Sequence, residues 1–176
     1  MMTTTKCWIH MPMAAMILTA VLAIPLAAQQ PVPFKGTFQG QDSHDVLPQG
    51  ATTVLLRGTA TGNGTHLGKF SMIREVTGNL ATFTDAGSAE WIAANGDRIY
   101  TTVFGIAELP PDMPGFVEFT ETHTITGGTG RFTGAQGTFV VVVFHKLEAS
   151  GVAAGVETHD MFGSFHGTIP APGAAH

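Results

Sequence analysis

A glycine-rich stretch, residues 126–137, constrains this chain more than any other part of its sequence. It places five glycines between two runs that are typical of β-strands. Glycine adopts positive φ angles and allows close backbone approach at little steric cost. We therefore predict a tightly wound connection between two antiparallel strands, with Phe132 pointing into the core and Gly130 or Gly134 at positive φ.

Eight runs of strand-forming residues follow one another, separated by turn-forming residues, and no segment shows sustained helical periodicity. The runs are Phe34–Asp42, Thr52–Thr61, Gly68–Val76, Gly87–Ala94, Asp97–Ala107, Phe116–Ile125, Thr138–Glu148 and His159–Ile169. Eight antiparallel strands can close into a barrel, which removes exposed sheet edges. We predict an all-β fold, an eight-stranded antiparallel β-barrel, and the alternative is a two-sheet β-sandwich.

Three short segments are similar to motifs of a known group of barrels. They are GGTGRFTGA at residues 127–135, GNGTHLGKF at 62–70 and AANGD at 93–97. They resemble the allene oxide cyclase barrel group, which includes plant allene oxide cyclases, dirigent proteins and secreted bacterial proteins. The resemblance implies a barrel that holds a small apolar molecule, and a function like guiding its cyclisation or coupling, chemistry that a shaped pocket can promote by orientation. No catalytic or cavity residue of that group can be matched to a position in this chain.

The first residues have the pattern of a targeting segment. Lys6 precedes an apolar run over residues 13–26, and Ala27-Ala28 offers a small-residue cleavage site. We predict a signal peptide over residues 1–28 and a secreted or periplasmic protein, with an uncleaved anchor as the alternative. The single cysteine, Cys7, lies in this segment. The mature chain is therefore expected to lack thiols and disulfides.

The remaining sequence predicts one β-barrel domain over residues 29–169 and a disordered tail over 170–176. The chain has a formal net charge of −5, and its few lysines and arginines do not cluster. Phosphate binding requires concentrated basic residues, so we expect no nucleic-acid partner. We also expect no membrane association of the mature form, and the sequence does not predict an oligomeric state.

Strand alternation predicts which polar residues face the inside of the barrel. Glu121 and His123 share a strand face with valine, phenylalanine and isoleucine, while threonines occupy the opposite face. By the same argument His145 and Arg74 lie on the apolar faces of their strands. Alternation does not decide the direction of Arg98 or Tyr100.

Two interpretations of the inward polar residues remain open, because buried charge is costly unless it is paired. In the first, Arg74, Glu121, His123 and His145 form a polar cluster that binds a ligand in an apolar cavity. In the second, they form a structural ion pair or are strand-end residues that reach solvent. Glu121, His123 and His145 could supply three metal ligands, but no His-x-His or His-Glu-x-x-His spacing occurs, and we expect no metal and no cofactor.

Other chemistries lack their motifs. The glycine-rich stretch does not end in the Gly-Lys-Ser/Thr of a phosphate-binding loop, and no Gly-x-Ser-x-Gly sequence is present. The sequence therefore predicts a secreted β-barrel that binds a small hydrophobic ligand in its lumen, and it leaves catalysis open. The alternative is a non-enzymatic structural or interaction barrel whose core is filled, chiefly by phenylalanines.

Overall fold

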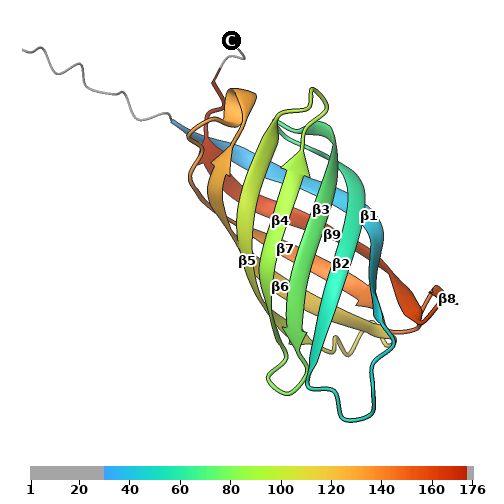
Figure 1. Ribbon diagram of the computed structural model, residues 1–176. Helices are drawn as coiled ribbons and strands as arrows, with labels where there is room; N and C mark the ends of the chain where they lie inside the picture. The colour runs from blue at the N-terminus through green and yellow to red at the C-terminus, as the bar shows by residue number, and fades with distance from the viewer. Residues whose placement is uncertain (1–29, 174–176) are drawn as a thin grey trace, which may run out of the picture.

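The computed structural model describes residues 30–173, and 69% of them lie in antiparallel strands (Figure 1). The strands are β1 (Pro31–Asp45), β2 (Thr53–Gly64), β3 (Gly68–Asn79), β4 (Thr84–Ile92), β5 (Arg98–Glu108), β6 (Phe116–Gly128), β7 (Gly137–Lys146), β8 (Gly151–Ala153) and β9 (Val156–Pro170). Each strand from β1 to β6 pairs with the next, and β9 pairs with both β7 and β1. Eight strands thus close into a barrel, with β8 as one extra strand paired to β9. The predicted barrel is confirmed, and the sandwich alternative is wrong.

Inward and outward residues alternate as the pleat of a strand requires. β5 is the clearest case, because exposed and buried residues alternate along its whole length. Arg98 and Tyr100, which the sequence did not place, both lie on the outer surface. Arg98 forms an ion pair there with Glu90 of β4.

The barrel has two different ends. The first, called here the glycine-rich end, carries the start of β1, the end of β9 and the connection between β6 and β7. The second, called the β8 end, carries β8 and the β3–β4 and β5–β6 connections. A packed aromatic section fills the lumen towards the glycine-rich end. Trp91 lies at its centre, with ring centroids 5.1 Å from Phe165 and 5.4 Å from Phe139.

The glycine-rich connection closes its end of the barrel. A short 3-10 helix, Gly130–Phe132, turns the chain, and the Phe132 side chain is 1% exposed. Gly130 and Gly134 have φ angles of 55° and 75°. The predicted inward Phe132 and the predicted positive φ angles are therefore confirmed.

The structure differs from the predicted strand limits in several places. β7 ends at Lys146, so Leu147, expected to continue the inward face, is exposed. β8 was not predicted. Residues 170–173, expected to belong to a disordered tail, are held in place, because Pro170 ends β9 and the Gly173 amide donates a hydrogen bond to the Arg131 carbonyl oxygen at 2.9 Å. Residues 174–176 and the predicted signal peptide lie outside the described residues. Within residues 30–173, no helix has the length and apolar character needed to cross a membrane.

Candidate functional site

All four residues predicted to face inward lie inside the barrel. Arg74 comes from β3, Glu121 and His123 from β6, and His145 from β7. Their exposed fractions are 6% or less. They form two neighbouring groups rather than one cluster, and together these groups are called here the charged layer of the lumen.

The first group is centred on Arg74. Its Nη2 atom lies 2.7 Å from Glu121 Oε1 and 3.4 Å from Asp85 Oδ2. Glu121 is therefore paired across the lumen, from β6 to β3. Asp85, at the start of β4, is almost fully buried and was not predicted as a site residue.

His123 extends this group towards the aromatic section. Its Nε2 atom lies 3.0 Å from Glu121 Oε2, and its Nδ1 atom lies 3.0 Å from the Thr101 hydroxyl oxygen. Burial lowers the pKa of His123, although the Glu121 carboxylate acts in the opposite direction. The neutral ring then donates from Nε2–H to Glu121. Its Nδ1 lone pair competes for the single Thr101 hydroxyl proton with the Ala89 carbonyl oxygen, which lies 3.2 Å from the same hydroxyl.

The two carboxyl groups that contact Arg74 respond differently to burial. Burial opposes ionisation of Glu121, but the Arg74 charge and the His123 hydrogen bond lower its pKa to about 2. Burial, reinforced by the negative charge of Glu121, raises the pKa of Asp85 to about 7, although Arg74 acts against this. Arg74 is buried, yet the charges of Glu121, Asp42 and Asp85 raise its pKa. Asp85 is thus the carboxyl group that exchanges its proton near neutral pH.

His145 belongs to a second group, with Asp42 of β1. Their Nδ1 and Oδ2 atoms are 3.1 Å apart, and Asp42 is fully buried. Burial acts to raise the pKa of Asp42, but the His145 contact and the Arg74 charge outweigh it and lower the pKa. Among the described residues, His145 Nε2 and Asp42 Oδ1 have no hydrogen-bond partner.

Two inward glycines make room for these charges. Gly58 of β2 lies between Asp42 and Arg74 in the cross-strand register, and a Cβ atom there would overlap Asp42 Oδ1. Gly105 of β5 lies in the same way between Asp85 and Glu121, and a Cβ atom would overlap Asp85 Oδ1. The absence of side chains at these two positions therefore leaves space inside the barrel for the Asp42 and Asp85 carboxyl groups.

An apolar pocket of about 180 Å³ lies at the β8 end. Its lining is almost entirely hydrophobic and comes from strand ends and the connecting segments: Val54, Leu56, Gly78, Asn79, Leu80, Phe83, Thr84, Ala107, Leu109, Val117, Phe119 and Leu147. The Phe119 ring also contacts the His145 ring edge-on, with centroids 5.3 Å apart. Phe119 thereby connects the pocket to the charged layer.

The pocket rim contains a strained residue. Phe83 has a φ angle of 54°, in the left-handed region that bulky side chains avoid. Its carbonyl oxygen accepts a 2.7 Å hydrogen bond from the Ala107 amide, which fixes this backbone against β5. Such strain persists only where the surroundings hold it, and it is common at ligand sites.

Sequence reasoning missed Asp42, Asp85 and Thr101, although alternation contained the signal for two of them. Asp42 has the same parity in β1 as the inward Phe34 and Phe38. Asp85 has the same parity in β4 as Trp91. The strand run predicted for β4 began too late to include Asp85, and Asp42 was the last residue of its run.

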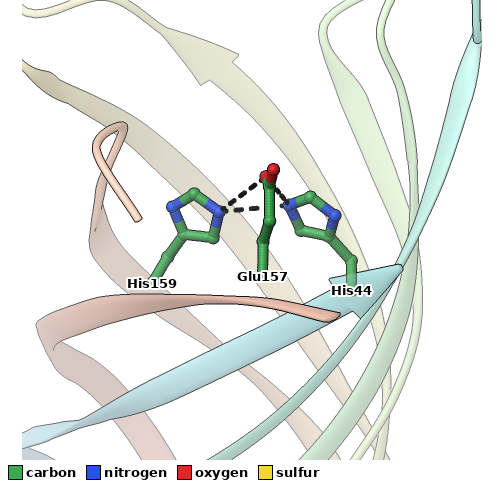
Figure 2. A group of neighbouring side chains, drawn as sticks. All are labelled: His44, Glu157 and His159. Carbon is green, nitrogen blue, oxygen red and sulfur yellow. Dashed lines mark hydrogen bonds and ion pairs between the residues drawn. The ribbon is translucent and has the colours of Figure 1, made fainter. Parts of the chain in front are cut away.

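The triplet weighed as metal ligands does not have the arrangement of a metal site. Glu121 and His123 bond to each other and to Arg74, whereas His145 pairs with Asp42. A different group, His44, Glu157 and His159, brings its ligand atoms within 4.8 Å of one another. This group lies on inward positions at the β8 end (Figure 2).

Comparisons with protein-family models, with curated proteins and with solved structures found no match to this chain. The site must therefore be interpreted from its own geometry.

Proposed function

We propose that this protein binds a small apolar molecule in the pocket at the β8 end, with the ligand's polar edge towards His145. One observation carries the proposal: Phe119, which lines an unfilled hydrophobic pocket, contacts His145, and His145 Nε2 and Asp42 Oδ1 lack partners among the described residues. Ligand sites commonly combine an apolar wall with a few convergent polar groups.

The pocket size limits the ligand. A volume of about 180 Å³ is below that of typical drug-sized sites. It is comparable to the engineered apolar cavity of roughly 150 Å³ that takes up benzene in another protein. We therefore infer that one ring, or one end of a longer apolar molecule, occupies the pocket.

The charged layer has a positioning role in this proposal. Arg74, Glu121 and His123 use their polar atoms mainly on one another, so their role in this proposal is to hold the charged layer in place rather than to contact the ligand. Of the four predicted ligand-binding residues, His145 is the one beside the pocket, through its contact with Phe119. A pocket that holds a reactive molecule in one conformation is also what guided cyclisation or coupling would require.

A second candidate function is a structural or interaction barrel without a ligand. The observation in its favour is the aromatic section, where Trp91, Phe34, Phe139 and Phe165 pack edge to face and fill the lumen. The two functions make different predictions only for the pocket at the β8 end. A binding barrel takes up a ligand there, and a structural barrel does not.

The test is an NMR titration of the protein with 4-methylphenol and with toluene. We expect shift changes confined to the β8 end and a lower Kd for 4-methylphenol, because its hydroxyl can bond to the charged layer. Ala107→Leu fills the pocket and should abolish these changes, whereas Ala86→Leu, on the outer surface of β4, is the matched control. Equal responses of both variants, or no response of the parent, would contradict the proposal.

A further inference from the structure

We propose that His44, Glu157 and His159 form a binding site for a divalent transition-metal ion at the β8 end of the barrel. The inference is independent of the small-molecule pocket. It departs from the expectation of no metal, which rested on the spacing of histidines in the sequence.

Strand register brings the three residues together. His44 of β1 lies directly opposite Glu157 of β9, and His159 follows two positions along β9 on the same face. The planes of the two imidazole rings are nearly parallel, with an interplanar angle of 12° and centroids 5.1 Å apart. Figure 2 shows the Glu157 carboxylate between the two rings. Because the histidines are 115 residues apart, no local motif could have revealed the site.

Hydrogen bonds at the other ring nitrogens fix the tautomers. His44 Nδ1 lies 2.8 Å from the Asp45 carbonyl oxygen, and His159 Nδ1 lies 2.9 Å from the Lys146 carbonyl oxygen. A carbonyl oxygen only accepts, so each Nδ1 carries a proton, and the neutral form of each ring presents a lone pair at Nε2. Metal-bound histidines are oriented by this kind of hydrogen bond to a backbone carbonyl.

The two lone pairs then face one another. His44 Nε2 and His159 Nε2 are 3.1 Å apart, and Glu157 Oε2 is 3.7 Å from each of them. With both Nδ1 atoms protonated, either one shared proton or a cation must lie between the two Nε2 atoms. A cation at this point would satisfy all three atoms.

The ligand set and the spacing indicate the class of cation. Two imidazole nitrogens and one carboxylate suit zinc and its transition-metal neighbours, whereas calcium and magnesium prefer oxygen ligands. Nitrogens 3.1 Å apart can both reach zinc at ~2.0–2.1 Å, with an N–Zn–N angle of about 100°. The Glu157 side chain is 32% exposed, so it has room to move towards the ion. Three protein ligands leave a coordination position for water or another molecule.

The test uses the untagged full chain, titrated calorimetrically with zinc chloride, and Co²⁺ absorption as a second readout. We expect one ion per chain, tetrahedral Co²⁺ bands between roughly 500 and 700 nm, and no response to Ca²⁺ or Mg²⁺. His159→Gln and Glu157→Gln should each weaken zinc binding at least tenfold. His166→Gln, an exposed histidine on the outer face of β9, is the matched control and should leave binding unchanged.

Absence of stoichiometric zinc binding by the parent would overturn the proposal. So would zinc binding that survives His159→Gln and Glu157→Gln, which would indicate adventitious binding by surface histidines. If a variant fails to fold, the parent still decides the question, because zinc should raise its Tm in a concentration-dependent way. A proton shared by the two rings, with no metal bound, also contradicts the inference.

Discussion

Arg74 Nη2 lies 2.7 Å from Glu121 Oε1, and this buried ion pair connects β3 to β6 across the lumen. A buried charge left without its partner is strongly destabilising. We therefore expect Arg74→Gln to lower the free energy of unfolding by about 3–5 kcal/mol in a denaturant titration.

Arg57 supplies the matched control on the same barrel. Its pair with Glu75 has a similar N–O distance, 2.9 Å, but both side chains are more than half exposed. Arg57→Gln should therefore cost less than about 1 kcal/mol. Similar losses in the two variants would show that the charged layer is solvated.

The raised pKa of Asp85 should make the stability of the protein depend on pH, and substitution of Asp85 should remove this contribution. Its pKa is raised to about 7 in the folded chain from 3.8, so the folded state binds more protons between these values. Asp85 thus contributes stability that is fully present below pH 4 and is lost as pH rises through 7. The stability of Asp85→Asn relative to the parent should therefore increase from pH 5 to pH 8.

Guanidinium unfolding at four pH values over this range checks the Asp85 prediction. Asp112→Asn, in the exposed loop between β5 and β6, is the control. A stability difference between Asp85→Asn and the parent that stays constant from pH 5 to 8 would count against protonation of Asp85 in the folded protein.

In the glycine-rich connection, we expect alanine substitutions at Gly130 and Gly134 to destabilise the protein by unequal amounts. Gly130 and Gly134 both have positive φ, which costs alanine roughly 1–2 kcal/mol. A Cβ at Gly130 would in addition overlap the Asp97 carboxylate, whereas Gly134 has open space around it. Thermal melts should show Gly130→Ala as the more destabilised variant. A Gly130→Ala variant as stable as the parent would be incompatible with this turn.

Export remains a prediction from the sequence. Cleavage near Gln29 would remove Cys7 and leave a mature protein without thiols. Intact mass of the exported protein measures this directly. An exported form that retains Cys7 would show that the leader is not cleaved there.

The eight strand runs were enough to predict the barrel, and period-two alternation was enough to predict that Arg74, Glu121, His123 and His145 face inward. Arg74, Glu121 and His123 share strand faces with residues that are apolar and buried, so burial of one predicts burial of the others. The pairing within the layer could not be predicted in this way. Arg74 contacts Glu121 because strand register and barrel closure place β3 and β6 opposite each other across the lumen. Neither the register nor the closure can be determined from a single sequence.

The pocket and the histidine group were missed for the same reason. Phe119 and Ala107 look like ordinary core residues in sequence, and only the closed barrel shows that the space between them is unfilled. His44 lay beyond the predicted end of the first strand, and its opposite residue, Glu157, lay before the predicted start of the last. Errors of a few residues at strand ends therefore concealed the end of the barrel where the candidate sites lie.

A crystal structure with 4-bromophenol bound tests the proposed function most directly, because bromine gives an anomalous signal that locates the ligand without ambiguity. The pocket account predicts one bromine peak at the β8 end, among Val54, Leu56 and Phe119, with the phenol oxygen directed towards His145. Bromine peaks confined to the outer surface, or a pocket that stays empty at saturating ligand, would contradict it.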